Sequence, residues 1–207
     1  MYFPQDAEDC RAIELGKLTF HLFLGECWNL QTSSSFSKFA SGIRQADELP
    51  CLLTLKLRHL PVVESSLSSI LALCPNLQRL DISFTGVVHS PLQLASTPRL
   101  EKLSLTSTSI ATTDLLAALP MLPRLKTISL GALGVQHGTI RDSSVMTLTD
   151  SVLRELTTIL ENFTCLESLN LLGNTKMGTS KSDSALLNFV TRVGRKLKVA
   201  YSWSQCQ

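Results

Sequence analysis

The sequence predicts an α/β protein in which short parallel strands alternate with helices or turns. The first observation is a Leu-x-x-Leu-x-Leu pattern whose successive first leucines lie 25, 23, 25 and 41 residues apart. The copies begin at Leu52, Leu77, Leu100, Leu125 and Leu166. Repeats of this length are typical of solenoids, in which each unit buries its apolar side against its neighbours. The chain is therefore predicted to be a leucine-rich-repeat solenoid, a segment of a right-handed α/β horseshoe.

The second observation is that the segments between the copies suit a return crossover. Side chains alternate between the two faces of a strand, so Leu103 should be buried while Ser104 points outward. Parallel strands need a connection that returns to the starting edge of the sheet. Leu67 and Leu71 belong to one helical stripe, and residues 114–119 repeat this spacing in shorter form. We therefore expect a parallel concave sheet, with helices or turns on the convex side.

The chain divides into three parts by the regularity of these repeats. Residues 1–50 are predicted to form an N-terminal cap or a degenerate repeat. Its strand would contain Leu15, Leu18 and Phe20, and its helix would bury Phe36, Phe39, Ala40 and Ile43. Residues 51–198 hold the repeats, with a polar insertion loop near 134–148, and residues 199–207 form an irregular end that contains a candidate last strand.

Two further helices are predicted after the insertion loop. Apolar residues recur with helical spacing over residues 152–163 and over about 183–195. The first of these helices has the stronger pattern, and Thr149 or Ser151 is available to cap its start.

Composition and charge exclude several classes of function. The 207 residues carry a net charge of +2, too balanced for non-specific binding to nucleic acid, which needs a clearly basic surface. No apolar run approaches the roughly 20 residues of a membrane helix, and the start of the chain has acids where a secretory signal needs basic residues. The six cysteines show no zinc-ligand spacing and are predicted to be packing residues. We therefore expect a cytoplasmic or nuclear protein that binds neither nucleic acid nor membrane.

No motif for catalysis or cofactor binding is present. Gly131, Gly134 and Gly138 have neither the dinucleotide spacing nor that of a Walker A loop. No serine lies in a Gly-x-Ser-x-Gly elbow, and the four histidines are scattered singly. The sequence therefore predicts a non-catalytic protein without a cofactor or a metal. The alternative is a small hydrolase that uses the insertion loop.

The outward positions of the strands are the predicted binding site for a protein partner. The residues singled out are Lys56, Arg58, Arg79, Asp81, Lys102, Ser104 and Asn170. Because adjacent strands lie about 4.8 Å apart, the four cations in this set would share one patch. We expect an acidic partner segment to dock there, with the clustered charge orienting its approach. The alternative is that long cations merely solvate an exposed sheet.

One repeat carries a family resemblance. Residues 74–83, Cys-Pro-Asn-Leu-Gln-Arg-Leu-Asp-Ile-Ser, are similar to the cysteine-containing repeat of ribonuclease-inhibitor-like and F-box leucine-rich-repeat proteins. Residues 193–198 resemble the helix-to-strand junction of the same class. The asparagine usual at the ninth repeat position occurs only as Asn174, with Thr85 and Thr108 supplying a hydroxyl in two other repeats.

This resemblance implies a protein-interaction scaffold. In the F-box branch it implies the substrate-recognition or adaptor part of a ubiquitin ligase, with ligase subunits among its partners. The alternative within the same class is a ribonuclease-inhibitor-like binder that blocks a partner enzyme.

Overall fold

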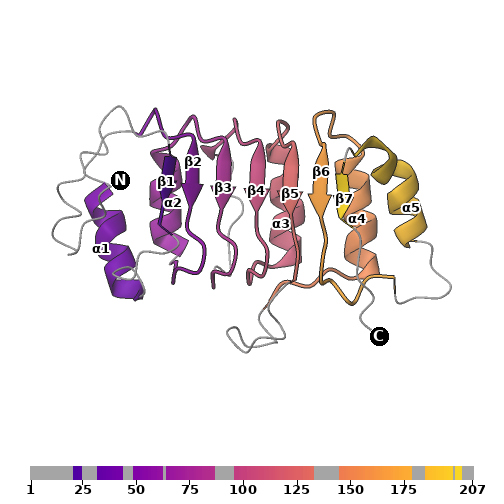
Figure 1. Ribbon diagram of the computed structural model, residues 1–207, viewed down its shortest axis with the longest axis horizontal. Helices are drawn as coiled ribbons and strands as arrows, with labels where there is room; N and C mark the ends of the chain where they lie inside the picture. Colours follow the sequence, from indigo (N-terminus) through magenta and orange to yellow (C-terminus); the bar gives the residue numbers. More distant parts are fainter. Residues whose placement is uncertain are drawn as a thin grey trace.

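The strands form one parallel sheet whose order follows the chain. The computed structural model describes residues 21–24, 32–43, 49–62, 64–86, 96–132, 145–178, 185–197 and 199–201. Within them the strands are β1 His21–Phe23, β2 Thr54–Lys56, β3 Arg79–Asp81, β4 Lys102–Ser104, β5 Thr127–Ser129, β6 Ser168–Asn170 and β7 Val199–Tyr201. Each pairs in parallel with the next, in the order β1 to β7 (Figure 1). The predicted α/β architecture with a parallel sheet is confirmed.

The pairing register places equivalent positions of the repeats in straight rows. The central row contains Leu55, Leu80, Leu103, Ile128 and Leu169. All five side chains are almost completely buried. Polar residues on both sides of each central residue point to the other face, as the alternation in a strand requires. The leucine pattern therefore predicted the register of β2 to β6 correctly.

The helices complete the core. They are α1 Ser33–Ile43, α2 Glu64–Ala72, α3 Thr112–Ala118, α4 Asp150–Leu160 and α5 Ala185–Arg192, with 3-10 turns η4 Leu119–Met121 and η5 Gly194–Lys196. Helices α2, α3 and α4 lie along one side of the sheet, with α1 and α5 near its two ends (Figure 1). Helix α1 packs on α2, α3 on α4, and α4 on α5. Their apolar stripes join the leucine rows in one hydrophobic cluster.

Local sequence explains where these helices begin and which face they bury. The predicted stripe of α1 is buried in full: Phe36, Phe39, Ala40 and Ile43. Helix α4 begins where Thr149 accepts a hydrogen bond from the backbone N–H of Val152 at 3.4 Å, so the predicted cap is confirmed. Asp150, in the first turn of α4, also accepts a hydrogen bond from the N–H of Gly178 at 2.6 Å, which fastens the turn after β6 to this helix.

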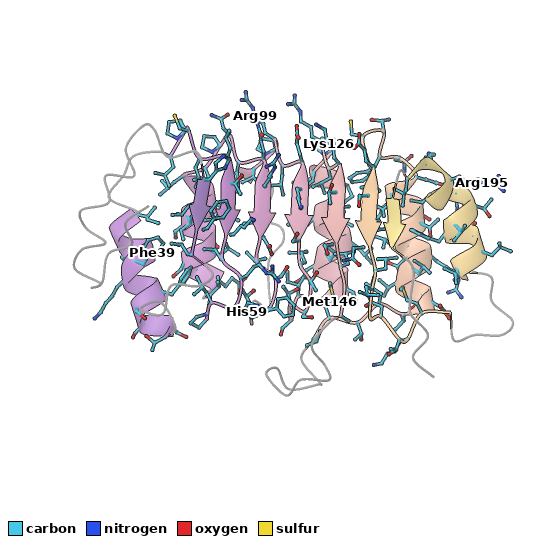
Figure 2. All side chains as sticks on the ribbon, viewed as in Figure 1. Phe39, His59, Arg99, Lys126, Met146 and Arg195 are labelled. Atoms are coloured by element: carbon cyan, nitrogen blue, oxygen red, sulfur yellow. The ribbon has the colours of Figure 1, made fainter. Side chains whose placement is uncertain are left out.

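The two ends and the insertion are described only in part. Leu15, Leu18 and Phe20, the expected first strand, lie outside the described residues. The first described strand is centred on Leu22, which pairs with Leu55. Residues 134–144 of the insertion also lie outside the described residues. In its described part, Met146, which is labelled in Figure 2, donates its N–H to the carbonyl of Thr108 at 2.7 Å. Of residues 199–207, the described three form β7.

A polar side chain closes the turn after three of the strands. Thr85 and Thr108 donate their hydroxyls to the carbonyl three residues earlier, at 2.6 and 3.0 Å. Asn174 donates to the equivalent carbonyl at 2.9 Å. It also donates to the carbonyl of Leu130 in the preceding repeat and accepts from the N–H of Leu148, both at 2.9 Å. Asn174 therefore links its own turn to Leu130 and Leu148, in addition to the turn hydrogen bond that Thr85 and Thr108 also make.

In four repeats, the residue immediately before the turn-closing position has a left-handed backbone conformation. The φ angles are 59° at His59, 59° at Phe84, 53° at Ser107 and 82° at Gly173. The N–H groups of the first three donate to carbonyls of the next repeat at 3.3, 2.8 and 2.8 Å, which continues the parallel pairing past the strands. Side chains at this position therefore lie along the edge where the strands end, as Figure 2 shows for His59.

Candidate protein-binding surface

The face of the sheet opposite the leucine rows, here called the outer face, carries two polar rows. One contains Thr54, Arg79, Lys102, Thr127 and Ser168, and the other Lys56, Asp81, Ser104, Ser129 and Asn170. Arg58 follows Lys56 by two residues, so it also points outward. All seven residues predicted as a binding site therefore lie on one face, while their role in binding stays a prediction.

The predicted residues differ in how much surface they present. Lys56, Arg58, Arg79 and Lys102 are exposed, whereas Ser104 retains 8% of its accessible surface. A short side chain in the middle of a sheet is covered by neighbours on strands about 4.8 Å away. Ser104 therefore offers a partner little contact area, and the long cations offer most of it.

Apart from Lys102 at the start of β4, the half of the outer face formed by β4 to β6 carries small polar groups that bond to one another. The hydroxyls of Thr106 and Ser129 lie 2.9 Å apart, and Asn170 donates its amide to the Ser129 hydroxyl at 3.2 Å. Gly131 belongs to the same surface, where a Cβ would come within 3.0 Å of the carbonyl oxygen of Leu172. A side chain at position 131 would therefore disturb the pairing of the β5 and β6 segments. The surface around Gly131 consequently carries only short, polar groups.

The half formed by β1 to β3 carries cations that lie on aromatic rings. The Lys56 Nζ is 4.6 Å from the ring centroid of Phe23, and the Arg58 guanidinium carbon is 5.4 Å from that of Phe84. Phe84 in turn stacks on His59, with centroids 4.5 Å apart and planes 10° from parallel. Both cation distances fall within the roughly 6 Å over which a ring attracts a cation.

Sequence reasoning missed the three aromatic members of this arrangement. A signal was present, because His59 and Phe84 are 25 residues apart, the same interval as Leu55 and Leu80. Two rings at one repeat position must lie side by side if the register holds. We call Phe23, Lys56, Arg58, His59 and Phe84 the cation–aromatic cluster.

Asp81 is the acid of the outer face. Its Oδ2 lies 3.8 Å from the Nε of Arg58, and both side chains are partly exposed. Its Oδ1 accepts a hydrogen bond from the N–H of Ser83 at 3.0 Å. An exposed pair at this distance contributes about 0–1 kcal/mol, so Asp81 partly neutralises Arg58 without fixing it firmly.

A second group of charges lies at the opposite edge, where the strands begin. Figure 2 shows Arg99 and Lys126 there. Lys126 pairs with Glu101 at 2.9 Å, and the hydrogen bond that its ammonium group donates to the Glu101 carboxylate raises the pKa of Lys126. Lys126 is therefore already partnered within the molecule by a closer carboxylate than the one that Arg58 meets in Asp81.

The described residues offer little for catalysis. His21 and His59 both stack on phenylalanine rings. Burial raises the pKa of the Cys74 thiol to about 12, and its sulfur donates to the carbonyl of Ile70 at 3.1 Å. A thiol that stays protonated is a poor nucleophile. Within the described ranges, no three His, Cys, Asp or Glu side chains gather closely enough to hold a metal ion.

In the part of the chain that the structure describes, no helix has both the length and the apolar character to cross a bilayer.

Comparison with known proteins gives likeness of shape without likeness of sequence. No family model matches the chain, and no curated protein matches it. An internalin from Listeria monocytogenes aligns with a TM-score of 0.48 and 17% identity over 83% of this chain and 56% of its own. The tropomodulin C-terminal domain of Caenorhabditis elegans gives 0.46 and 11% over 93% of both chains. The second actin-binding site of leiomodin-1 gives 0.46 and 10% over 92% of this chain and 86% of its own.

This chain therefore spans just over half the length of that internalin.

Proposed function

We propose that this chain is a non-catalytic leucine-rich-repeat solenoid that binds a protein partner through the outer face of its sheet. The observation that carries the proposal is the register of β2 to β6, which lines up outward side chains in two rows. Paired strands fix the backbone that carries these side chains before a partner binds, and this preorganisation favours recognition.

The chemistry of the outer face supports binding over catalysis. Its hydroxyls bond to one another, and two of its cations lie on aromatic rings. Such groups suit contact with another protein better than proton transfer. The alternative of a hydrolase would depend on the insertion loop near 134–148, of which residues 134–144 lie outside the described residues.

Among protein-binding functions, the resemblance of residues 74–83 favours the substrate-recognition or adaptor part of a ubiquitin ligase. The alternative is an inhibitor that occupies the site of a partner enzyme. Both would act in the cytosol or nucleus, where the free thiols of Cys51, Cys74 and Cys165 stay reduced.

Photocrosslinking tests the proposed face. A benzoylphenylalanine residue would be placed at Thr127 or Ser168 on the outer face, and at Thr113 or Ala117 on α3 as matched controls. In extract of the cells that make the protein, we expect discrete crosslinked species from the first two positions only, lost when unlabelled protein competes. Crosslinks that form from α3 alone would contradict the proposal.

The identity of the crosslinked species separates the two finer functions. Ubiquitin-ligase subunits would support the adaptor. An enzyme whose activity falls when this chain is added would support the inhibitor.

A further inference from the structure

We propose that the cation–aromatic cluster binds an extended acidic segment that also carries a large apolar side chain, and that Asp81 competes with this segment for Arg58. The inference rests on the proposed function and names the chemistry of the partner. It concerns β1 to β3 and the edge where these strands end.

The charge of the outer face favours an acidic partner. Among the outward positions of β2 to β6, three are cations and one, Asp81, is an acid, and Arg58 adds a fourth cation just after β2. The remaining outward positions of these strands are uncharged. A partner segment with several carboxylates would therefore be attracted to one half of the face and given a direction along it.

The rings position the cations without neutralising them. Lys56 leans toward β1, where its Nζ lies over Phe23, and Arg58 leans toward β3, where its guanidinium lies over Phe84. A cation on a ring keeps its charge and has fewer conformations to lose when a carboxylate arrives. Lys56 and Arg58 are two residues apart on one chain, about 6.6 Å, which matches alternate residues of an extended segment.

The rings also offer apolar surface next to the charge. Phe23 is 44% exposed, a large value for an aromatic side chain, and it stacks on the exposed His21. Phenylalanine and arginine are both enriched in protein interfaces, and arginine is also frequent among the residues that dominate binding energy. An apolar side chain of the partner would cover Phe23 while neighbouring carboxylates contact the cations.

Asp81 gives the site an internal competitor. Its carboxylate lies where a partner's carboxylate would approach Arg58, at 3.8 Å from Nε. Asn170, in the same row, shows that an amide can accept the equivalent backbone hydrogen bond, from Leu172 at 2.9 Å. Asp81→Asn should therefore keep the turn while releasing Arg58.

The test uses synthetic probes with the full chain. The main probe is a fluorescent peptide of alternating glutamate and glycine with one central phenylalanine. The comparison probes replace all glutamates by glutamine, or the phenylalanine by alanine, and a short oligothymidylate provides the nucleic-acid arm. Fluorescence anisotropy would measure Kd at low salt.

The protein variants are matched in charge. Lys56→Gln with Arg58→Gln removes two positive charges from the cluster. Arg99→Gln with Arg124→Gln removes two from exposed residues near the opposite edge. If each lost contact is worth somewhat under 1 kcal/mol, the first pair should weaken binding about tenfold and the second less than about twofold. Asp81→Asn should tighten binding about threefold, and Phe23→Ala should remove the preference for the phenylalanine peptide.

The outcomes separate this inference from the proposed function. Equal losses in the two charge-matched variants, or oligothymidylate bound as tightly as the main peptide, would overturn the inference. If the peptide fails to bind while Thr127 and Ser168 still crosslink a partner, the inference falls and the proposed function stands. If crosslinks arise only from α3, the proposed function falls as well.

Discussion

Asp81 and Asn170, three strands apart in one row of the sheet, accept the same backbone hydrogen bond. Asp81 takes the N–H of Ser83 at 3.0 Å, and Asn170 takes the N–H of Leu172 at 2.9 Å. The bond closes the end of the strand in both repeats. One acceptor is charged and the other is neutral, so the fold at this position requires an oxygen and not a charge.

This equivalence predicts the stability of two variants at Asp81. Asp81→Asn should change the free energy of unfolding by less than about 0.5 kcal/mol, because the amide oxygen replaces the carboxylate. Asp81→Ala should lower it by about 1 kcal/mol, because the Ser83 N–H loses its partner. Urea unfolding followed by circular dichroism would measure both. Equal losses in the two variants would show that the charge, and not the acceptor, stabilises the turn.

Asn174 provides a stronger test of the turns. Asn174→Ala should lower the free energy of unfolding by about 2–4 kcal/mol, because buried groups of Leu130, Leu148 and Leu171 lose a partner. Asn174→Thr should cost less, because Thr85 and Thr108 show that a hydroxyl satisfies the carbonyl three residues earlier.

Hydrogen exchange separates the two roles of Asn174. The Leu148 amide should exchange faster in both variants, since neither side chain supplies the Asn174 oxygen. An unchanged Leu148 exchange rate in Asn174→Ala would contradict the proposed tie.

The left-handed backbone conformation at His59 predicts that glycine will destabilise the fold less than valine at this position. Its φ is 59°, and glycine occupies the equivalent position as Gly173. Both His59→Gly and His59→Val lose the stack on Phe84, but only valine must adopt a conformation that β-branched residues avoid. His59→Val should therefore be about 1–2 kcal/mol less stable than His59→Gly in denaturant unfolding. Equal stability would mean that the turn can adopt a different backbone conformation.

The leucine rows could be predicted from sequence because strand alternation and the recurrence of the Leu-x-x-Leu-x-Leu pattern together fix the register. Leu55, Leu80 and Leu103 occupy the same place in successive copies, 25 and 23 residues apart, and therefore meet in one row. The cation–aromatic contacts could not be predicted in the same way. They depend on the left-handed turns at His59 and Phe84 and on which way Lys56 and Arg58 lean, and neither follows from a hydrophobic pattern.

The first strand shows a different limit of prediction from sequence, which concerns the repeat frame. Leu15, Leu18 and Phe20, which fit the repeat frame loosely, lie outside the described residues, and the first described strand is centred on Leu22. Apolar residues recur throughout this stretch, so the sequence offers more than one repeat frame. The pairing of Leu22 with Leu55 is a long-range contact, which no local pattern of apolar residues predicts.

Burial of Cys74 predicts a dependence of stability on alkaline pH. Its pKa is raised from 9.0 to about 12 by burial, so the folded chain keeps the thiol protonated where the unfolded chain ionises. The resulting stability is fully present below pH 9 and is lost as pH rises toward 12. Under reducing conditions, the free energy of unfolding should fall by about 1 kcal/mol more between pH 8 and pH 10 in the wild type than in Cys74→Ala. Parallel pH profiles would contradict this cause.

The leucine register itself is tested by two adjacent substitutions. Leu103 is completely buried in the central row, whereas Lys102 is exposed on the outer face. Leu103→Asp loses roughly 2 kcal/mol of apolar burial and adds an unpaired carboxylate to the core at a cost of several more, which approaches the whole stability of a typical domain. Lys102→Asp introduces the same group one residue earlier and should change stability by less than about 0.5 kcal/mol, because water still solvates it. Circular-dichroism melts should therefore show no folding transition for Leu103→Asp and a nearly unchanged midpoint for Lys102→Asp. The reverse order would place the leucines on the outer face and remove the basis for the candidate binding surface.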